Sequence, residues 1–406
     1  MAEVVDRERR VRVPTWVGST TVLGVVWLVS RVVLVAVVFG IGEPAWREVT
    51  YYQRWHDQLT GGTFPVDDVS WQYPPGAALV MLLPRLMPFG GYVPAFVGAV
   101  VLVDALVFVA LVRAARGAGA PTTGVWLWVL AIPGLLTVPF TRYDVVVTGL
   151  VVLGLVALRS RPGWAGVLAG IGASVKVWPA VVLLGAGKRS WVWAAGSVAV
   201  VCGVLALVLD NPFGFLTAQS GRGLEFESVG GAALAAARLF GYPGEIEYRY
   251  GSFEIVGPLV PEIAQASVIA SVLAALWLGW WRLRVGVVGA EGAADAAMTA
   301  VLLFVVTSRV ISPQYMIWLV GLGAVCLVSA RTTQRPVVAL VALAIPLTAL
   351  EYPVYFSRIM SEWAPGTVIL LLRNLLLVVA AIWSATLLWR GRRRTSEAGG
   401  GLLIGG

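Results

Sequence analysis

Apolar runs long enough to cross a bilayer alternate with short polar loops along almost the whole chain. A helix needs about 20 apolar residues to span the hydrocarbon core, and the first run, residues 17–41, has about 25. It follows a basic flank and lacks a small-residue cleavage site, which favours a retained span over a signal peptide. Further runs predict spans at residues 91–114, 122–138, 142–158, 190–209, 263–282, 296–310, 313–330, 335–350 and 366–389.

Two other apolar stretches carry interruptions that a straight helix does not tolerate. Residues 74–88 contain a Pro-Arg pair, and residues 163–187 contain Lys176 followed by a proline. If neither stretch crosses, the basic loops all face the cytoplasm, as the positive-inside rule expects; if both cross, two of these loops face outside. We therefore predict an all-α polytopic membrane protein with about ten transmembrane helices. Residues 74–88 would then lie along the outer interface, and residues 163–187 would form a half-depth hairpin that enters from the cytoplasm.

Composition supports this class and narrows the function. With 58% hydrophobic and 13% charged residues, the chain cannot cover a globular surface with solvated side chains. Its net charge of +8 is carried almost wholly by arginines at the ends of apolar runs, which indicates membrane topology and no nucleic-acid partner. Cys202 and Cys326 lie in apolar runs, and His56 is the one histidine, so no disulfide framework or Cys/His metal site is expected. We predict no cofactor, although outer carboxylates leave a weakly held divalent cation open.

This topology divides the chain into a cytoplasmic N-terminus at residues 1–16, a transmembrane domain at residues 17–390 and a disordered cytoplasmic tail at residues 391–406. Carboxylates, arginines and aromatic residues concentrate on the outer face, so the function is expected there. The external loops of this prediction are residues 42–90, 137–144, 210–262, 309–315 and 351–365.

Several motifs in these loops follow one another in a recognisable order. The first loop contains Glu48 four residues before Tyr52, and later Trp71-Gln72-Tyr73-Pro74-Pro75. Downstream come Thr141-Arg142-Tyr143-Asp144, Ser174-Val175-Lys176-Val177-Trp178-Pro179, Arg222-Gly223-Leu224-Glu225-Phe226-Glu227-Ser228 and Ser312-Pro313-Gln314-Tyr315. With these motifs the sequence resembles the GT-C superfamily of glycosyltransferases over residues 17–390. It is most similar to glycosyltransferase family 87, which comprises polyprenyl-phosphate-mannose-dependent mannosyltransferases and related arabinofuranosyltransferases.

The resemblance implies a GT-C-like fold and roles for particular residues. Glu48 occupies the family's catalytic acidic position, usually Asp, and would act as the general base of a single inverting displacement. Asp144 would order that base or bind sugar hydroxyls. The positions that would bind the donor phosphate and sugar are Arg142, Lys176, Arg222, Glu225, Glu227, Gln314, Tyr315, Tyr52 and Tyr73.

Each of these residues also has a structural explanation. Glu48 could be a solvated carboxylate paired with Arg47 or Arg54, Asp144 could form an interfacial pair with Arg142, and Lys176 could extend along its stem to the cytoplasmic interface. Asp67 and Asp68 are expected to form a turn beside Pro65, and Ser312-Pro313 to start a helix. Most of Trp46, Trp55, Trp71, Tyr51, Tyr52 and Tyr73 are expected to form an aromatic belt at the headgroups.

Arg31 and Asp104 support a separate structural prediction. They lie about 16 and 20 Å below the outer ends of the first two spans, at 1.5 Å of rise per residue. An unpaired charge at that depth is costly. We therefore expect a buried ion pair between these two spans.

The resulting functional prediction is a bacterial plasma-membrane glycosyltransferase whose active site faces the extracytoplasmic side. It would move a sugar, mannose in preference to arabinofuranose, from a polyprenyl-monophosphate donor to a glycolipid or glycan acceptor. The alternative is a transporter or flippase of lipid-linked sugars, which would need ionisable groups along a path through the midplane. A non-enzymatic scaffold is a third interpretation, and the carboxylate-rich loops disfavour it.

Overall fold

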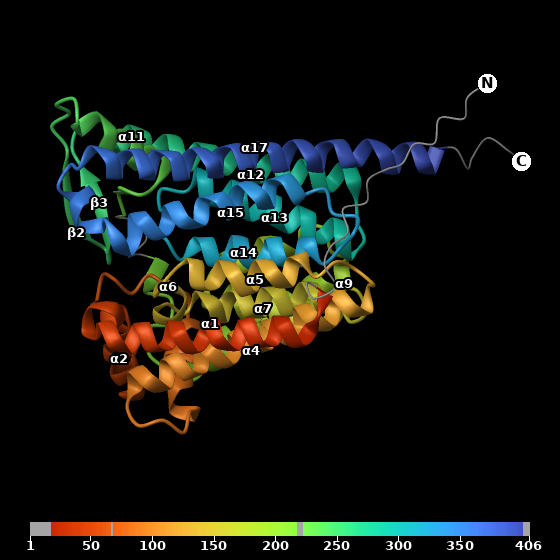
Figure 1. The fold of residues 1–406 in the computed structure, drawn as a ribbon, viewed down its shortest axis with the longest axis horizontal. Helices are drawn as coiled ribbons and strands as arrows, with labels where there is room; N and C mark the ends of the chain where they lie inside the picture. The colour runs from red at the N-terminus through yellow and green to blue at the C-terminus, as the bar shows by residue number, and fades with distance from the viewer. Residues whose placement is uncertain (1–17, 66–67, 217–221, 401–406) are drawn as a thin grey trace, which may run out of the picture.

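The computed structural model describes residues 18–65, 68–216 and 222–400, with side chains as far as residue 391. Within these ranges, seven helices are long and apolar enough to cross a membrane, and they run side by side in one bundle (Figure 1). They are α1 (Thr20–Ile41), α4 (Tyr92–Gly117), α9 (Lys188–Val208), α12 (Val260–Val285), α13 (Ala290–Thr307), α15 (Arg335–Ala349) continued by η4 (Leu350–Val354), and α17 (Ala364–Gly400). The predicted all-α polytopic membrane fold is confirmed.

Three shorter apolar helices occupy the middle of the bundle: α5 (Thr123–Gly134), α7 (Asp144–Ala157) and α14 (Tyr315–Leu327). Every residue of α14 from Met316 to Leu327 is buried. Glycines allow this close packing, because a Cβ on Gly321 would lie 2.3 Å from Thr148 Cγ2 and one on Gly124 would lie 2.2 Å from the Ala324 carbonyl oxygen. Small residues at helix contacts let backbones approach one another, which drives association where no hydrophobic force acts between helices.

The ambiguous stretch at residues 163–187 folds back into a hairpin, as predicted, but the hairpin is not half-depth, because it runs the whole length of α7. Its first arm, α8 (Pro162–Val175), packs antiparallel against α7, and its second arm contains the short helix η3 (Trp178–Leu183). Ser190, in the first turn of α9, donates a hydrogen bond to the Pro162 carbonyl oxygen, so both feet of the hairpin lie at the same end of the bundle. Because α8 is as long as α7, its tip at Lys176 reaches the end of α7 that carries Asp144.

The connections at one end of the bundle form a small polar layer, here called the site end (Figure 1). It contains α2 (Glu43–Thr60), α3 (Ala77–Leu82), η2 (Leu83–Leu86), α6 (Val138–Thr141), α11 (Val229–Arg238) and α16 (Phe356–Met360). Ser228 caps α11 by accepting a hydrogen bond from Gly231 N. The sequence analysis does not predict the antiparallel sheet β1-β3-β2, formed by Leu224–Glu225, Ser252–Val256 and Glu245–Arg249.

The predicted pair of Arg31 and Asp104 is confirmed. Arg31 Nε and Nη2 donate to the two Asp104 oxygens at 2.9 and 3.0 Å, and both side chains are buried. Arg31 Nη1 and Nη2 also donate to the carbonyl oxygens of Val129 and Trp128 on α5, so the pair joins α1, α4 and α5.

Some predictions concern residues that the structure does not describe. Residues 1–16 and Asp67 lie outside the described ranges. The helix α17 continues as far as Gly400, past residue 391, where the sequence analysis places the start of the tail.

Candidate functional site

The external loops predicted from the sequence meet at the site end. Loop 42–90 contacts loop 137–144 through Glu48 and Arg142, and it contacts loop 210–262 through Gln72 and Arg222. Loop 210–262 reaches residues 309–315 through Glu225 and Ser312, and residues 351–365 through Arg238 and Glu362. Side chains that are far apart in the sequence therefore form one continuous polar region.

Two neighbouring ion pairs form the part of this region that we call the carboxylate cluster. Glu48 of α2 pairs with Arg142, and Asp144 accepts a bond from Lys176 Nζ at 2.6 Å. Local structure favours both positions. Asp144 begins α7, where the helix dipole stabilises a carboxylate, and Lys176 follows the last residue of α8, where it stabilises a cation. The cluster therefore holds two carboxylates and two cations in balance.

The two carboxylates differ in their access to a ligand. The Glu48 side chain is 27% exposed, whereas that of Asp144 is 1% exposed. Asp144 also accepts a bond from Trp318 Nε1 at 2.6 Å, so one of its oxygens holds both the lysine and the indole. A ligand can therefore reach Glu48, whereas Asp144 is buried against Lys176.

These contacts decide between the alternatives left by the sequence. The partner of Glu48 is neither Arg47, which pairs with Glu43, nor Arg54, whose guanidinium lies 5.2 Å from the Tyr51 ring. Arg142 and Asp144 do not pair with each other, because each has a partner on another element. Lys176 does not extend to the feet of its hairpin, which lie at the end of the bundle opposite the site end. Its ammonium lies 4.7 Å from the Tyr143 ring and 5.1 Å from that of Trp318.

The aromatic residues of the first loop were expected mostly as a headgroup belt, and this prediction is wrong for those that pack beneath the cluster. Tyr52, Trp55 and Trp71 are buried, and Tyr52 and Tyr73 each contact the Tyr143 ring, at 5.6 and 5.4 Å between centroids. Belt residues expose their polar edge to headgroups, whereas Trp55 Nε1 donates to Asp68 inside the protein. Asp68 also accepts a bond from Ser70 N, as a turn residue does.

Burial also sets the protonation of the phenols beside the cluster. It raises the pKa of Tyr52 and of Tyr73 well above the ordinary value, and the nearby Glu48 carboxylate raises both further. Both phenols are therefore neutral at physiological pH. Tyr73 is half-buried and can donate a hydrogen bond to a bound ligand, whereas Tyr52 is buried beneath the cluster.

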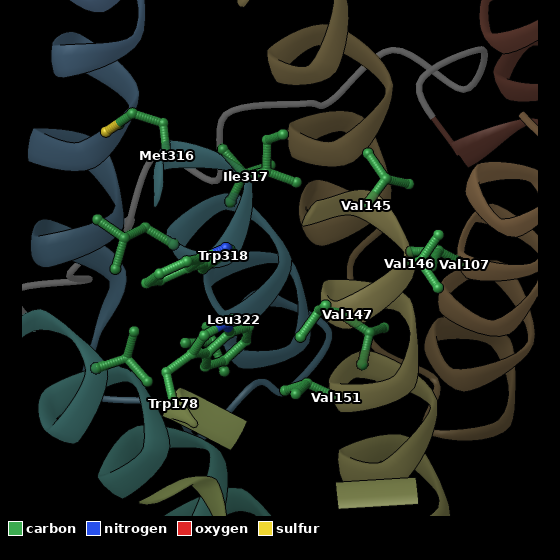
Figure 2. Packing of buried hydrophobic residues seen from close by; sticks show 14 of the residues in the cluster. Val107, Val145, Val146, Val147, Val151, Trp178, Met316, Ile317, Trp318 and Leu322 are labelled. Atoms are coloured by element: carbon green, nitrogen blue, oxygen red, sulfur yellow. The ribbon is translucent and has the colours of Figure 1, made fainter. Parts of the chain in front are cut away.

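An apolar floor supports the cluster from the membrane side. Trp178 of η3 stacks on Trp318 with ring centroids 4.9 Å apart, and Figure 2 places Val147 and Val151 of α7 beside them. On its other side Trp318 stacks on Tyr315, at 3.8 Å between centroids. The indole that binds Asp144 is therefore held by packing on both faces, as a preorganised site requires.

A second group of charges, here called the arginine cluster, lies beside the first. Arg222 donates to Gln72 Oε1 at 2.9 Å and to Ser252 Oγ at 3.0 Å, and its Nε lies 3.8 Å from Glu254. Arg309 Nη1 donates to the carbonyl oxygen of Arg222 at 2.7 Å. Gln72, which binds Arg222, directly precedes Tyr73, which contacts Tyr143 beneath the carboxylate cluster. The two clusters are therefore neighbours.

A cavity of about 330 Å³ opens beside the arginine cluster, between α12 and α13. Arg222, Arg309 and Ser308 line its polar end, and Val268 and Val272 of α12 line its apolar side. A phosphate attached to a hydrocarbon chain has this same division into a charged head and an apolar tail.

Glu225 and Glu227, both predicted to bind the donor, have different surroundings. Glu225 accepts a bond from Ser312 Oγ at 3.1 Å, and burial raises its pKa to about 7 against the lowering effect of Arg222. Glu227 faces away from the cavity, toward Arg373 and Glu351, which are fully buried and 2.8 Å apart. Burial and the neighbouring Glu351 raise the Glu227 pKa. The structure does not bring Glu227 to the carboxylate cluster, and its contacts are those of a residue that anchors the loop to α17.

The remaining predicted positions lie at the start of α14. Gln314 is its N-cap residue and is half-buried, and Tyr315 lies 5.9 Å from the Lys176 ammonium. The sequence analysis did not identify the following as candidate site residues: Gln72, Arg309, Trp318, Glu351 and Arg373. A signal existed for two of them, because Trp318 follows Tyr315 at helical spacing and Arg373 interrupts an apolar span.

The parts of the chain that the structure describes contain no cluster of side chains suited to bind a metal ion. Across those ranges no three His, Cys, Asp or Glu side chains come together as a metal site requires. The carboxylates of the carboxylate cluster are instead neutralised by arginine and lysine.

The bundle and its polar end define a polytopic membrane protein with a site at the base of its loops. A sequence model of glycosyltransferase family 87 matches residues 71–313, more than half of the chain, so the protein belongs to glycosyltransferase family 87. It is a membrane glycosyltransferase. The matched range includes Asp144, Lys176 and Arg222, whereas Glu48 precedes it. No curated protein and no solved structure matches the chain.

Proposed function

We propose that this glycosyltransferase takes a sugar, mannose, from a polyprenyl-monophosphate donor and transfers it to a glycolipid or glycan acceptor outside the cytoplasm. The observation that carries the proposal is the adjacency of an accessible, arginine-paired Glu48 and a cavity with two arginines at its polar end. The first supplies a base for an acceptor hydroxyl. The second supplies cations for a phosphate and an apolar wall for a prenyl chain.

In the proposed reaction Glu48 removes the proton from the acceptor hydroxyl as its oxygen attacks the anomeric carbon. The bond between that carbon and the phosphate oxygen breaks, and polyprenyl phosphate leaves with the electron pair. One displacement of this kind inverts the anomeric configuration. Arg142 holds the Glu48 carboxylate in place, and Asp144 holds Lys176 toward the reacting sugar.

Arg222 and Arg309 would bind the departing phosphate, whose negative charge grows as the bond breaks. Preorganised cations in a water-poor pocket stabilise such developing charge strongly. Gln72 and Ser252 fix the Arg222 guanidinium in advance, so little reorganisation is needed. Tyr73, Tyr315 and Gln314, on the adjoining elements, would contact the sugar.

The rival function, a flippase of lipid-linked sugars, would need polar groups that change partners through the midplane. Arg31 and Asp104 instead bind each other with two hydrogen bonds, and Arg373 is held by Glu351. Such pairs stabilise one arrangement of the helices. We accordingly favour a fixed site at one face of a bacterial plasma membrane, the extracytoplasmic one, with both termini in the cytoplasm.

The proposal is tested by offering purified protein three labelled donors: polyprenyl-phosphate mannose, polyprenyl-phosphate arabinofuranose and a nucleotide-activated mannose, each with a membrane lipid extract. Transfer from the first donor alone is expected. Transfer from the arabinofuranose donor would reassign the sugar, and transfer from the nucleotide donor would refute the lipid-phosphate assignment. Val272→Trp, which fills the cavity between α12 and α13, should raise the KM for the lipid donor at least several-fold.

A further inference from the structure

A second cavity lies away from the site, on the membrane-facing surface between α5 and α15. Its volume is about 520 Å³, within the range of ~300–1,000 Å³ typical of ligand pockets. The end of α14 forms its base at Leu327. Its walls include Trp126, Leu130 and Ala131 of α5 and Val338, Ala339 and Ala342 of α15.

The lining is apolar except at one end, where Thr123 begins α5 and Arg335 begins α15. This is the end of the bundle opposite the carboxylate cluster. Arg335 is exposed, and the hydrogen bond that it donates to the Ser329 carbonyl oxygen is long at 3.5 Å. Arg331 is exposed four residues earlier in the same loop. The groove therefore has a cationic mouth and a hydrocarbon-like interior.

We infer that this groove binds a bilayer phospholipid with a net anionic headgroup. One acyl chain would fill the space between α5 and α15, and Arg335 would pair with the headgroup phosphate. The rise of about 1.5 Å per residue makes the wall from Arg335 to Ala342 about 10 Å long, enough for much of an acyl chain. Basic residues at the membrane surface attract anionic lipids, so charge selects the headgroup.

Such a lipid would complete the packing of a helix that is short for a span. α5 has 12 residues and packs extensively against α14, whereas its contact with α15 is limited. A chain seated between α5 and α15 would couple them, so the bound lipid stabilises the folded protein by mass action.

The test uses the delipidated, purified full chain in a neutral detergent. Phosphatidylglycerol and phosphatidylcholine with identical acyl chains are added, and the unfolding temperature Tm is measured. Phosphatidylglycerol should raise Tm by several degrees more than phosphatidylcholine does. Arg335→Gln should abolish this difference, whereas Arg113→Gln, which removes an exposed arginine of α4 outside the groove, should preserve it.

A second variant tests the groove itself. Ala339→Trp, which fills it, should reduce the Tm shift caused by either lipid. Equal shifts for the two lipids with the unaltered protein, or an undiminished difference in Arg335→Gln, would overturn the inference. The inference would also be overturned if the unaltered protein self-associates and Ala339→Trp converts it to a monomer, because the groove would then bind a second copy of the chain. If Ala339→Trp does not fold, the comparison of Arg335→Gln with Arg113→Gln decides.

Discussion

Replacing Glu48 by glutamine is the sharpest perturbation of the proposed chemistry. Glutamine has the same shape and can still accept a hydrogen bond from Arg142, but it cannot take a proton from an acceptor hydroxyl. A positioned general base contributes about 10² to 10⁴ in rate. At about 1.36 kcal/mol for each factor of ten, this is roughly 2.7 to 5.4 kcal/mol of activation free energy.

The same change should barely affect the fold. The two partners are 27% and 16% exposed, so their ion pair is partly screened by solvent. Fully exposed pairs contribute about 0 to 1 kcal/mol to stability, and the partial exposure of this pair places it near the upper end of that range. Glu48→Gln should therefore be expressed and unfold like the unaltered protein, with kcat lowered at least about 100-fold and the donor KM little changed.

The assay is the initial rate of sugar transfer from labelled polyprenyl-phosphate mannose. Glu43→Gln is a matched control, because Glu43 lies on the same helix, is 66% exposed and pairs only with Arg47 among the described residues. It should retain full activity. Glu48→Asp, which keeps a carboxylate, should retain more activity than Glu48→Gln. If Glu48→Gln keeps more than a tenth of normal activity, the base is another group and the reasoning fails.

Three further outcomes are expected. Lys176→Met should lower kcat about 100-fold by removing a preorganised cation, while thermal unfolding shows that the fold persists; an unchanged kcat would assign Lys176 a purely structural role. Asp104→Asn should destabilise the protein by about 3 to 5 kcal/mol, because it leaves Arg31 buried without its counter-charge. The double change Arg31→Met/Asp104→Leu should destabilise it less, as measured by thermal unfolding. Equal destabilisation by the two changes would argue against the pair. The donor KM should rise several-fold between pH 6 and pH 8, because Glu225, with a pKa of about 7, is protonated at the lower pH and competes with the phosphate for Arg222 once it is ionised. This pH dependence of KM should disappear in Glu225→Gln. If it persists there, another group causes it.

The spans were predictable because each depends on local composition. Apolar runs locate α1, α4 and α17, and the depth of Arg31 and Asp104 along their helices was enough to predict their pairing. The hairpin at residues 163–187 was predictable as well, since a lysine followed closely by a proline rules out a straight helix through this stretch. Its depth was not, because the predicted half-depth hairpin runs the whole length of α7.

The partners within the site were not predictable, because they are set by tertiary packing. Lys176 and Asp144 are 32 residues apart, and Trp318 lies 174 residues from the carboxylate it binds. The sequence places these residues at one face but contains no signal for which cation meets which carboxylate. Arg142 and Asp144, neighbours in the chain, were the natural pair to expect. The structure separates them because Asp144 begins α7 and points to α8 and α14.

The aromatic residues illustrate a limit of reasoning from composition. Tyrosine and tryptophan in a loop beside a span fit either a headgroup belt or a buried cluster. Burial of Trp55 depends on Asp68, which accepts its indole hydrogen after the chain has turned back. In the sheet β1-β3-β2, only the 2-residue strand β1 is too short to show a periodic pattern. The 5-residue strands β2 and β3, separated by Tyr250-Gly251, do carry a hairpin signal that the sequence analysis missed.

The most direct measurement follows both products of the proposed reaction at once. Vesicles that contain only this protein, polyprenyl-phosphate mannose labelled in the sugar, and an acceptor lipid extract are sampled over time. The account predicts that labelled sugar enters a new glycolipid or glycan while free polyprenyl phosphate appears in equal amount. Label that stays on the donor and merely crosses to the other leaflet would contradict it, and would identify the protein as a flippase.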